Sequence, residues 1–273
     1  MATAEAERAP PDQDEHLAVT FRKSVDEGRV RLARTWPGLL ATGFVGGVDV
    51  SLGILALLVV KHETGSIVLG ALAFTTGFIA LTLGKSELFT ENYLVPVAAV
   101  VAHKASTRSL IRLWAGTGTM NLAGGWVVTG LIMMALPRLG STAIEIAEFY
   151  PRLGLGREAF ALGIIGGVVI TVMTWMEHGG SSVLSRIVAA VVAGFLLAVA
   201  PLNHVIVVSL EMFAALHVGA PFGYAEWLGV AALATVANMV GGLVLVTLLR
   251  LVQVGARDIG QRREEASEEA APR

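Results

Sequence analysis

His204 is the one histidine in the middle of a long apolar stretch. The other histidines lie in polar tails or at the ends of apolar stretches. An imidazole changes charge near physiological pH, so it can donate a hydrogen bond to an anion or exchange a proton with a weak acid. Ionisable groups within a membrane are costly and are functional by default. The alternative is a packed histidine whose ring is satisfied by backbone groups. We expect His204 to act on a solute.

A second polar group interrupts an earlier apolar stretch with the sequence Gly84-Lys-Ser-Glu-Leu-Phe-Thr-Glu-Asn92. Buried charges are normally paired. Lys85, Glu87 and Glu91 could therefore form a salt-bridged plug that holds this loop. The sharper hypothesis is that Lys85 attracts an anion toward a pore.

Two further side chains accompany this loop. The hydroxyl of Thr90 could hydrogen-bond a solute, cap the helix that follows, or do both. Asp49, in the preceding apolar stretch, could pair with Lys85 or line a route for protons or cations. The residues alone leave these alternatives open.

The elements that must position these residues are apolar helices. Of the 273 residues 54% are hydrophobic and 15% are charged, a balance unlike that of soluble domains. About 20 apolar residues cross a bilayer as a helix. Six stretches reach spanning length, namely 37–60, 66–83, 113–136, 159–176, 182–200 and 226–249. We predict an all-α integral membrane protein with six transmembrane helices.

The second and fifth of these stretches are longer than one straight crossing. They run from residue 66 to about 103 and from 182 to about 216. The first contains the charged loop, and the second contains Ala200-Pro-Leu-Asn-His204. Charged or irregular backbone at membrane depth is tolerated only inside protein or beside a cavity. We therefore predict that both helices are broken, with Asn203 in the second break.

An internal repeat relates the two halves. The segment 43–51 resembles 163–171, and Asn121-Leu-Ala-Gly-Gly resembles Asn238-Met-Val-Gly-Gly. The two repeats are residues 37–136 and 158–250. Because each holds three spans, an odd number, the halves must be inverted relative to each other, and such an arrangement points to a solute site near the membrane midplane. Glycines let membrane helices pack closely. We expect Asn121 and Asn238 to brace the broken helices by hydrogen bonds to freed backbone.

The chain ends are polar. Lysine and arginine are concentrated before residue 37, around residues 104–112 and after residue 249, which places both termini in the cytoplasm. Residues 1–16 read as a disordered tail. The pattern of residues 17–36 predicts an amphipathic helix, either on the membrane surface or in solution. The composition of residues 251–273 predicts a charged tail.

With its Glu87-Leu-Phe-Thr90 string and His204, the chain resembles the formate/nitrite transporter family over about residues 35–250. The resemblance implies an aquaporin-like fold, a homopentamer in a bacterial inner membrane, and one pore per protomer for small monovalent anions. It also implies that Thr90 and His204 form the pore centre. Apolar constrictions are implied at Phe74, Phe78, Leu88, Phe89, Ile170 and Leu197.

Four positions depart from the usual family pattern. Gly167 and Val208 stand where family members commonly carry asparagine, Asn203 stands where glutamate is frequent, and Lys85 replaces a small residue. These departures suggest a divergent branch that resembles a poorly characterised inner-membrane subgroup. They affect the expected substrate more than the expected fold.

Several other functions find no support in the sequence. The absence of cysteine removes iron–sulfur clusters and cysteine-based zinc sites. No clustered His, Asp and Glu motif suggests a metalloenzyme, and no basic stripe suggests nucleic-acid binding. We expect no enzyme activity, cofactor or metal, and as partners a small anion, membrane lipid and other copies of the chain. A neutral-solute channel, which would normally carry two Asn-Pro-Ala loops, and a non-transporting scaffold are the alternatives.

Overall fold

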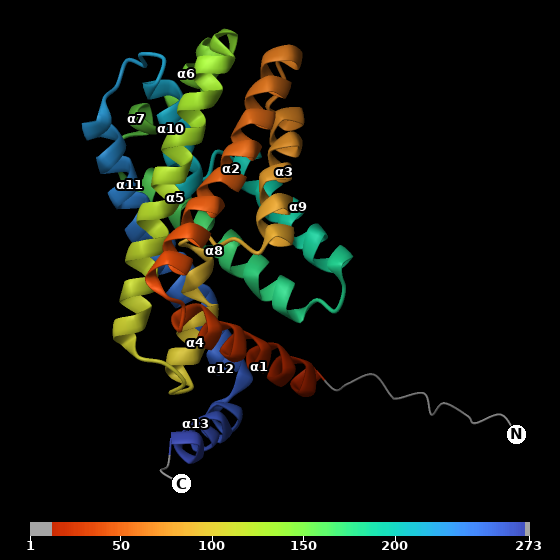
Figure 1. Cartoon of the computed structure of the whole chain (residues 1–273). Coiled ribbons are helices and arrows are strands. Elements are labelled where there is room, and N and C mark those ends of the chain that lie inside the picture. Colours follow the sequence, from red (N-terminus) through yellow and green to blue (C-terminus); the bar gives the residue numbers. More distant parts are fainter. Residues whose placement is uncertain (1–12, 271–273) are drawn as a thin grey trace, which may run out of the picture.

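Helices make up the regular structure of residues 13–270, the part of the chain that the computed structural model describes (Figure 1). Five helical segments are long and apolar enough to cross a membrane. They are α2 (Trp36–Thr64), α3 (Ile67–Gly84), α5 (Thr107–Ala135), α8 (Arg157–Gly179) and the run Tyr224–Val254, composed of α11 (Tyr224–Met239), the π-helix η3 (Val240–Leu248) and α12 (Leu249–Val254). The predicted count of six spans stays a prediction, because α9 (Val183–Val199) and α10 (Val205–Leu216) are each shorter.

Both predicted helix breaks are present. After α3 the chain leaves the helix at Lys85, whose φ of 54° is left-handed, and resumes in the short η1 (Glu91–Tyr93) and α4 (Val95–Val101). Pro96, in the first turn of α4, lacks the N–H that a continuous helix would need there. The second break lies between α9 and α10 and contains Pro201. The two breaks interrupt the stretches that were too long for a straight crossing.

The repeat is visible as matched close packing in the two halves. A Cβ atom on Gly47 of α2 would lie 2.2 Å from the carbonyl oxygen of Asn121 on α5. A Cβ atom on Gly167 of α8 would lie 2.2 Å from the carbonyl oxygen of Asn238 on α11. In each half the glycine therefore lets the helix touch the helix that carries the repeated asparagine.

The terminal helices lie at one end of the molecule, while η2 (Pro137–Leu139), α6 (Gly140–Ala147) and α7 (Phe149–Leu153) lie at the other (Figure 1). Helix α1 (Gln13–Leu32) is not a free solvated helix, because it buries Phe21 and Val25 against Leu94, Val95 and other residues of one cluster. Its apolar face is covered by the protein itself.

Both chain ends are helical where the structure describes them. Residues 13–16 belong to the first turn of α1, and residues 256–270 form the helix α13 (Ala256–Ala270) after a turn at Gly255, where φ is 89°. Charge alone does not prevent helix formation, since α13 is rich in good helix formers. The predictions for residues 1–12 and 271–273 fall outside the described residues.

We predict that Gly47→Ala destabilises the protein, because the new methyl group would meet a backbone oxygen that cannot turn away. Overpacking of this kind costs about 1–3 kcal/mol. Thermal unfolding in detergent should show a lower midpoint than wild type. The matched control is Gly38→Ala in the same helix, where the nearest atom to the new Cβ is 3.5 Å away. Equal midpoints for the two variants would contradict the packing argument.

Candidate functional site

The two helix breaks bring Thr90 and His204 into contact inside the protein. Thr90 Oγ1 lies 2.7 Å from His204 Nε2, and both residues are 0% exposed. The other ring nitrogen, Nδ1, accepts a long hydrogen bond of 3.4 Å from the N–H of Val207. In a neutral ring this bond leaves the proton on Nε2, which then donates to Thr90. The Thr90 hydroxyl hydrogen remains available for another acceptor, such as an anion.

Asn121 bonds to the first break with every polar atom of its side chain. Its Nδ2 donates to the carbonyl oxygens of Gly43 at 2.7 Å and Glu87 at 2.9 Å. Its Oδ1 accepts from the N–H of Phe89 at 2.8 Å. Asn121 therefore joins the break between α3 and η1 to helix α2.

Asn238 repeats this arrangement in the second half. Its Nδ2 donates to the carbonyl oxygens of Gly163 at 2.7 Å and Asn203 at 3.0 Å, and its Oδ1 accepts from the N–H of Val205 at 2.9 Å. Within the break, Asn203 has its own Oδ1 buried without a partner among the described residues. The bracing role predicted for the two asparagines requires bonds of this kind.

Five of the six apolar residues expected at constrictions are buried in one core cluster, namely Phe74, Phe78, Leu88, Ile170 and Leu197. The rings of Phe74 and Phe78 lie 5.6 Å apart between centroids. Phe89 differs, because it is only partly buried and its ring packs at 5.2 Å against Tyr93. Phe89 also lines a shallow surface groove with Ile111 and Trp114 of α5. Its ring therefore reaches the outside of the cluster.

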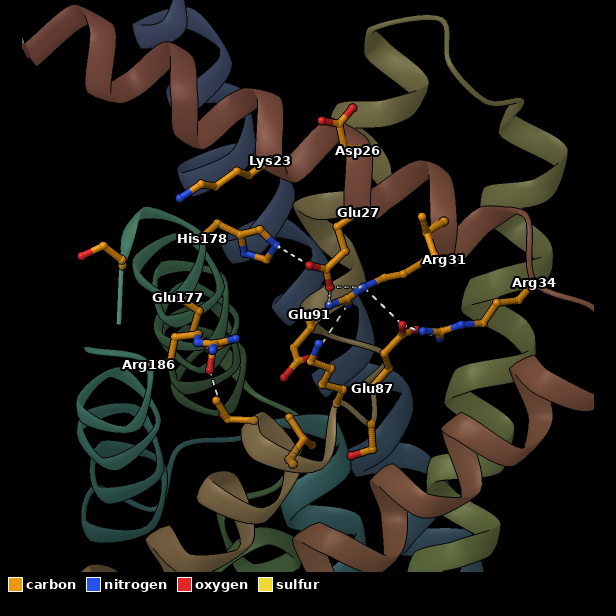
Figure 2. Close-up of a pocket in the computed structure, with 17 residues that line it drawn as sticks. Lys23, Asp26, Glu27, Arg31, Arg34, Glu87, Glu91, Glu177, His178 and Arg186 are labelled. Carbon is orange, nitrogen blue, oxygen red and sulfur yellow. Dashed lines mark hydrogen bonds and ion pairs between the residues drawn. The ribbon is translucent and has the colours of Figure 1, made fainter. Parts of the chain in front are cut away.

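A cavity of about 680 Å³ lies at the end of the molecule that carries α1 (Figure 2). We call it the vestibule. Its wall is formed by α1, the end of α3, the first break, the end of α8 and the start of α9. Leu81, Thr82 and Ser86 in this wall are close in sequence to Phe78 and Leu88, two of the residues expected at constrictions. Exposed residues such as Lys23 and Asp26 also line it, so the vestibule opens to solution.

Arg31 of α1 is the centre of a charged cluster in the vestibule (Figure 2). Its guanidinium nitrogens lie 2.5 Å from Glu27 Oε1, 3.2 Å from Glu87 Oε1 and 3.8 Å from Glu91 Oε2. Glu87 also pairs with Arg34. Burial by itself lowers the pKa of Arg31, but the neighbouring carboxylates outweigh burial and raise that pKa above its ordinary value. Arg31 therefore stays charged.

The cations paired with the carboxylates of this plug are arginines, not Lys85, which the sequence offered as one of two alternatives. Lys85 is exposed, lines the vestibule and makes no ion pair with any described residue. The carboxylates Glu87 and Glu91 are reached by arginines of the N-terminal segment. Asp49, the other candidate partner of Lys85, instead accepts a hydrogen bond of 2.5 Å from Ser86.

Sequence reasoning missed two carboxylates near this charge cluster. Glu27 lies 3.2 Å from His178 Nε2, and Glu177 accepts a 2.7 Å hydrogen bond from Thr82. Burial raises the pKa of Glu27, but the bond to His178 and the charge of Arg31 outweigh it and hold that pKa well below its usual range. The four-residue spacing of Glu27 and Arg31 was a visible signal for their pairing.

A third missed carboxyl lies in the opposite half of the molecule. Glu211 is buried in α10, and the Tyr150 hydroxyl donates to it at 2.6 Å. The signal was available, since Glu211 interrupts an apolar run.

Two departures from the family pattern have a structural setting. Gly167 lies against the backbone of Asn238, so a side chain there would collide with α11. Val208 is buried in a cluster with Tyr150 and Met212, away from the constriction residues. Neither position offers a polar group to the centre in this chain.

Residues 18–252 match the family model described as "Formate/nitrite transporter". The inner membrane protein YfdC of Escherichia coli is 26% identical over 89% of this chain and 81% of its own length. The formate channel BtFdhC of Bacillus thuringiensis is 26% identical over 80% of this chain and 87% of its own length. A solved structure described as a pentameric formate channel with formate bound superimposes with a TM-score of 0.64 at 20% identity, covering 78% of this chain and 95% of its own.

We predict that Asn238→Leu and Asn121→Leu each destabilise the protein strongly. Each change strands two buried backbone groups of a break, and each unsatisfied group costs about 1–3 kcal/mol. Thermal unfolding and size-exclusion chromatography in detergent measure the loss. Ser51→Ala is a control, since Ser51 donates only to the Gly47 carbonyl of its own helix. If both leucine variants unfolded like Ser51→Ala, the asparagines would not brace the breaks.

Proposed function

The chain belongs to the formate/nitrite transporter family, and from this membership we propose that it is an inner-membrane channel or transporter for small monovalent anions such as formate or nitrite. The observation that carries the proposal is the buried contact of 2.7 Å between Thr90 and His204, where the two broken helices meet. Family membership indicates transport rather than catalysis.

The vestibule supports an anionic substrate. Lys23, Lys85 and Arg186 line it without an ion-pair partner among the described residues. The carboxylates Glu27 and Glu87, by contrast, are in contact with arginine. Asp26 and Glu177 also line the vestibule, so its lysines and arginines equal its acids in number, and the attraction for an anion would act beside the three unpaired cations. A small anion would therefore collect in front of the first constriction.

The contact between Thr90 and His204 would give a permeating anion a polar site between two apolar constrictions. At Thr90 an anion would find a hydroxyl hydrogen and, beyond it, the N-terminal end of α10, which carries partial positive charge. The apolar cluster around Phe74 and Phe78 would be costly for a bare charge to cross. A weak acid avoids this cost if it is protonated before it passes. We therefore include proton coupling in the proposal.

Assembly and orientation also belong to the proposal. One structure with this fold is described as a pentameric formate channel, and we propose that this chain forms a homopentamer with one pore in each protomer. The lysine and arginine bias supports termini in the cytoplasm, and the vestibule would then face the cytoplasm. A C-terminal reporter active only in the periplasm would overturn this orientation.

We predict that His204→Phe lowers formate flux into proteoliposomes on the order of 100-fold, the loss typical of removing one preorganised hydrogen-bond donor. Stopped-flow measurement of internal pH follows the flux, and size-exclusion chromatography checks the fold. His217→Phe is the control, since His217 packs with a tilted ring against Trp126, away from Thr90 and the vestibule. Wild-type flux in a folded His204→Phe variant would make His204 a structural residue.

We predict that Lys85→Met folds normally, because Lys85 makes no ion pair within the described part of the chain. The formate concentration for half-maximal flux should rise roughly two- to fivefold at low salt and less at high salt. Lys85→Arg keeps the charge and should stay near wild type. Lys85 would be a bystander if flux through Lys85→Met were unchanged at every salt concentration.

A further inference from the structure

The Arg31 cluster contains more acids than bases. Arg31 and Arg34 are the only guanidinium groups within ion-pair distance of Glu27, Glu87 and Glu91 among the described residues. Of these three acids His178 contacts only Glu27, and Glu177 lies beside His178 in the same wall. With three carboxylates and two guanidiniums, the cluster lacks one positive charge, which a proton on His178 or on a carboxyl would supply.

Glu91 is the least compensated of the three acids. Its distance to Arg31 is 3.8 Å, compared with 2.5 Å for Glu27 and 3.2 Å for Glu87. It is 3% exposed, and its Oε1 is buried without a hydrogen-bond partner among the described residues. Glu27 stays ionised, because His178 and Arg31 hold its pKa low, and Glu87 contacts both arginines. A buried carboxyl with so little compensation favours its neutral form.

Glu91 is placed between the vestibule and the centre. It lies in the vestibule wall and directly follows Thr90, whose side chain contacts His204. The other charged groups that face the vestibule are Lys85 beside the break, Glu177 and His178 of α8, Arg186 of α9, and Lys23 and Asp26 of α1. Two of these groups are carboxyls. Glu177 accepts a hydrogen bond from Thr82, and Asp26 is exposed to solvent.

We infer that Glu91 holds an exchangeable proton in the vestibule wall and gives it to a weak-acid anion before the acid enters the apolar constriction. This inference rests on the proposed function. The O–H bond of the Glu91 carboxyl breaks, and a new O–H bond forms on a carboxylate oxygen of the substrate. Glu91 is left as a carboxylate facing Arg31, and a proton from vestibule water restores it. The transfer costs free energy because burial favours neutral Glu91, and the attraction between Arg31 and the resulting carboxylate offsets part of that cost. His204 is fully buried and takes no part in this transfer.

The test is formate uptake by proteoliposomes, with formate and internal pH followed on the same samples. Wild type should take up one proton with each formate. Glu91→Gln keeps the shape and neutrality of a protonated carboxyl but cannot donate its proton in this way, so flux should fall at least about tenfold. Glu91→Asp should retain part of the flux. Glu63→Gln, a change at an exposed acid, should leave flux at the wild-type level.

Three results would overturn the inference. One is wild-type flux with a wild-type proton-to-formate ratio in Glu91→Gln. Another is a loss of flux in Glu177→Gln that equals or exceeds the loss in Glu91→Gln, because the donor would then be Glu177.

The third result comes from spectroscopy. If Glu91→Gln does not fold, infrared difference spectra of wild type and Glu91→Asp decide. A protonated carboxyl band that shifts in Glu91→Asp supports the inference, and its absence contradicts it. A wild-type protein that carries no formate would refute the proposed function, whereas the infrared result reports on Glu91 independently.

Discussion

Two interrupted helices expose backbone N–H and C=O groups at a depth where lipid offers no hydrogen bonds, and each such group needs a partner inside the protein. Asn121 and Asn238 supply partners in the same way, each with two donated bonds and one accepted bond. The close packing of Gly47 and Gly167 brings the asparagine helices near enough for this. The contact between Thr90 and His204 depends on both breaks being held, because each break supplies one of the two residues.

A second layer of organisation comes from outside the repeat. Helix α1 reaches across the vestibule and places Arg31 against the first break, so the N-terminal segment and the pore share one set of charges. Glu27 and Glu87 of this cluster are in contact with arginine, whereas Lys85 and Arg186 have no ion-pair partner among the described residues. An anion would be attracted to the part of the vestibule beside these two cations. The least compensated acid, Glu91, is the residue next to Thr90.

Sequence reasoning predicted the features that depend on composition and local pattern. Hydropathy located the membrane helices, and the repeated Gly-Gly and Asn-Leu-Ala-Gly-Gly patterns located the matched packing. Thr90 and His204 were singled out by their places at the two breaks, and the family resemblance implied that they meet at the pore centre. Contacts between distant segments could not be predicted, since nothing local to Glu87 indicates that its cations lie in α1. The partly exposed position of the Phe89 ring could not be predicted for a related reason, because a motif does not specify which neighbour covers it.

The most direct test of the account is a comparison of solutes in proteoliposomes that contain the wild-type protein. Stopped-flow light scattering and an internal pH dye would follow formate, nitrite and glycerol under equal gradients. A pore with uncompensated cations at its mouth and a Thr90–His204 pair at its centre predicts rapid, pH-dependent uptake of formate or nitrite, with glycerol no faster than in empty liposomes. Rapid glycerol uptake without anion uptake would contradict the account and would favour a neutral-solute channel.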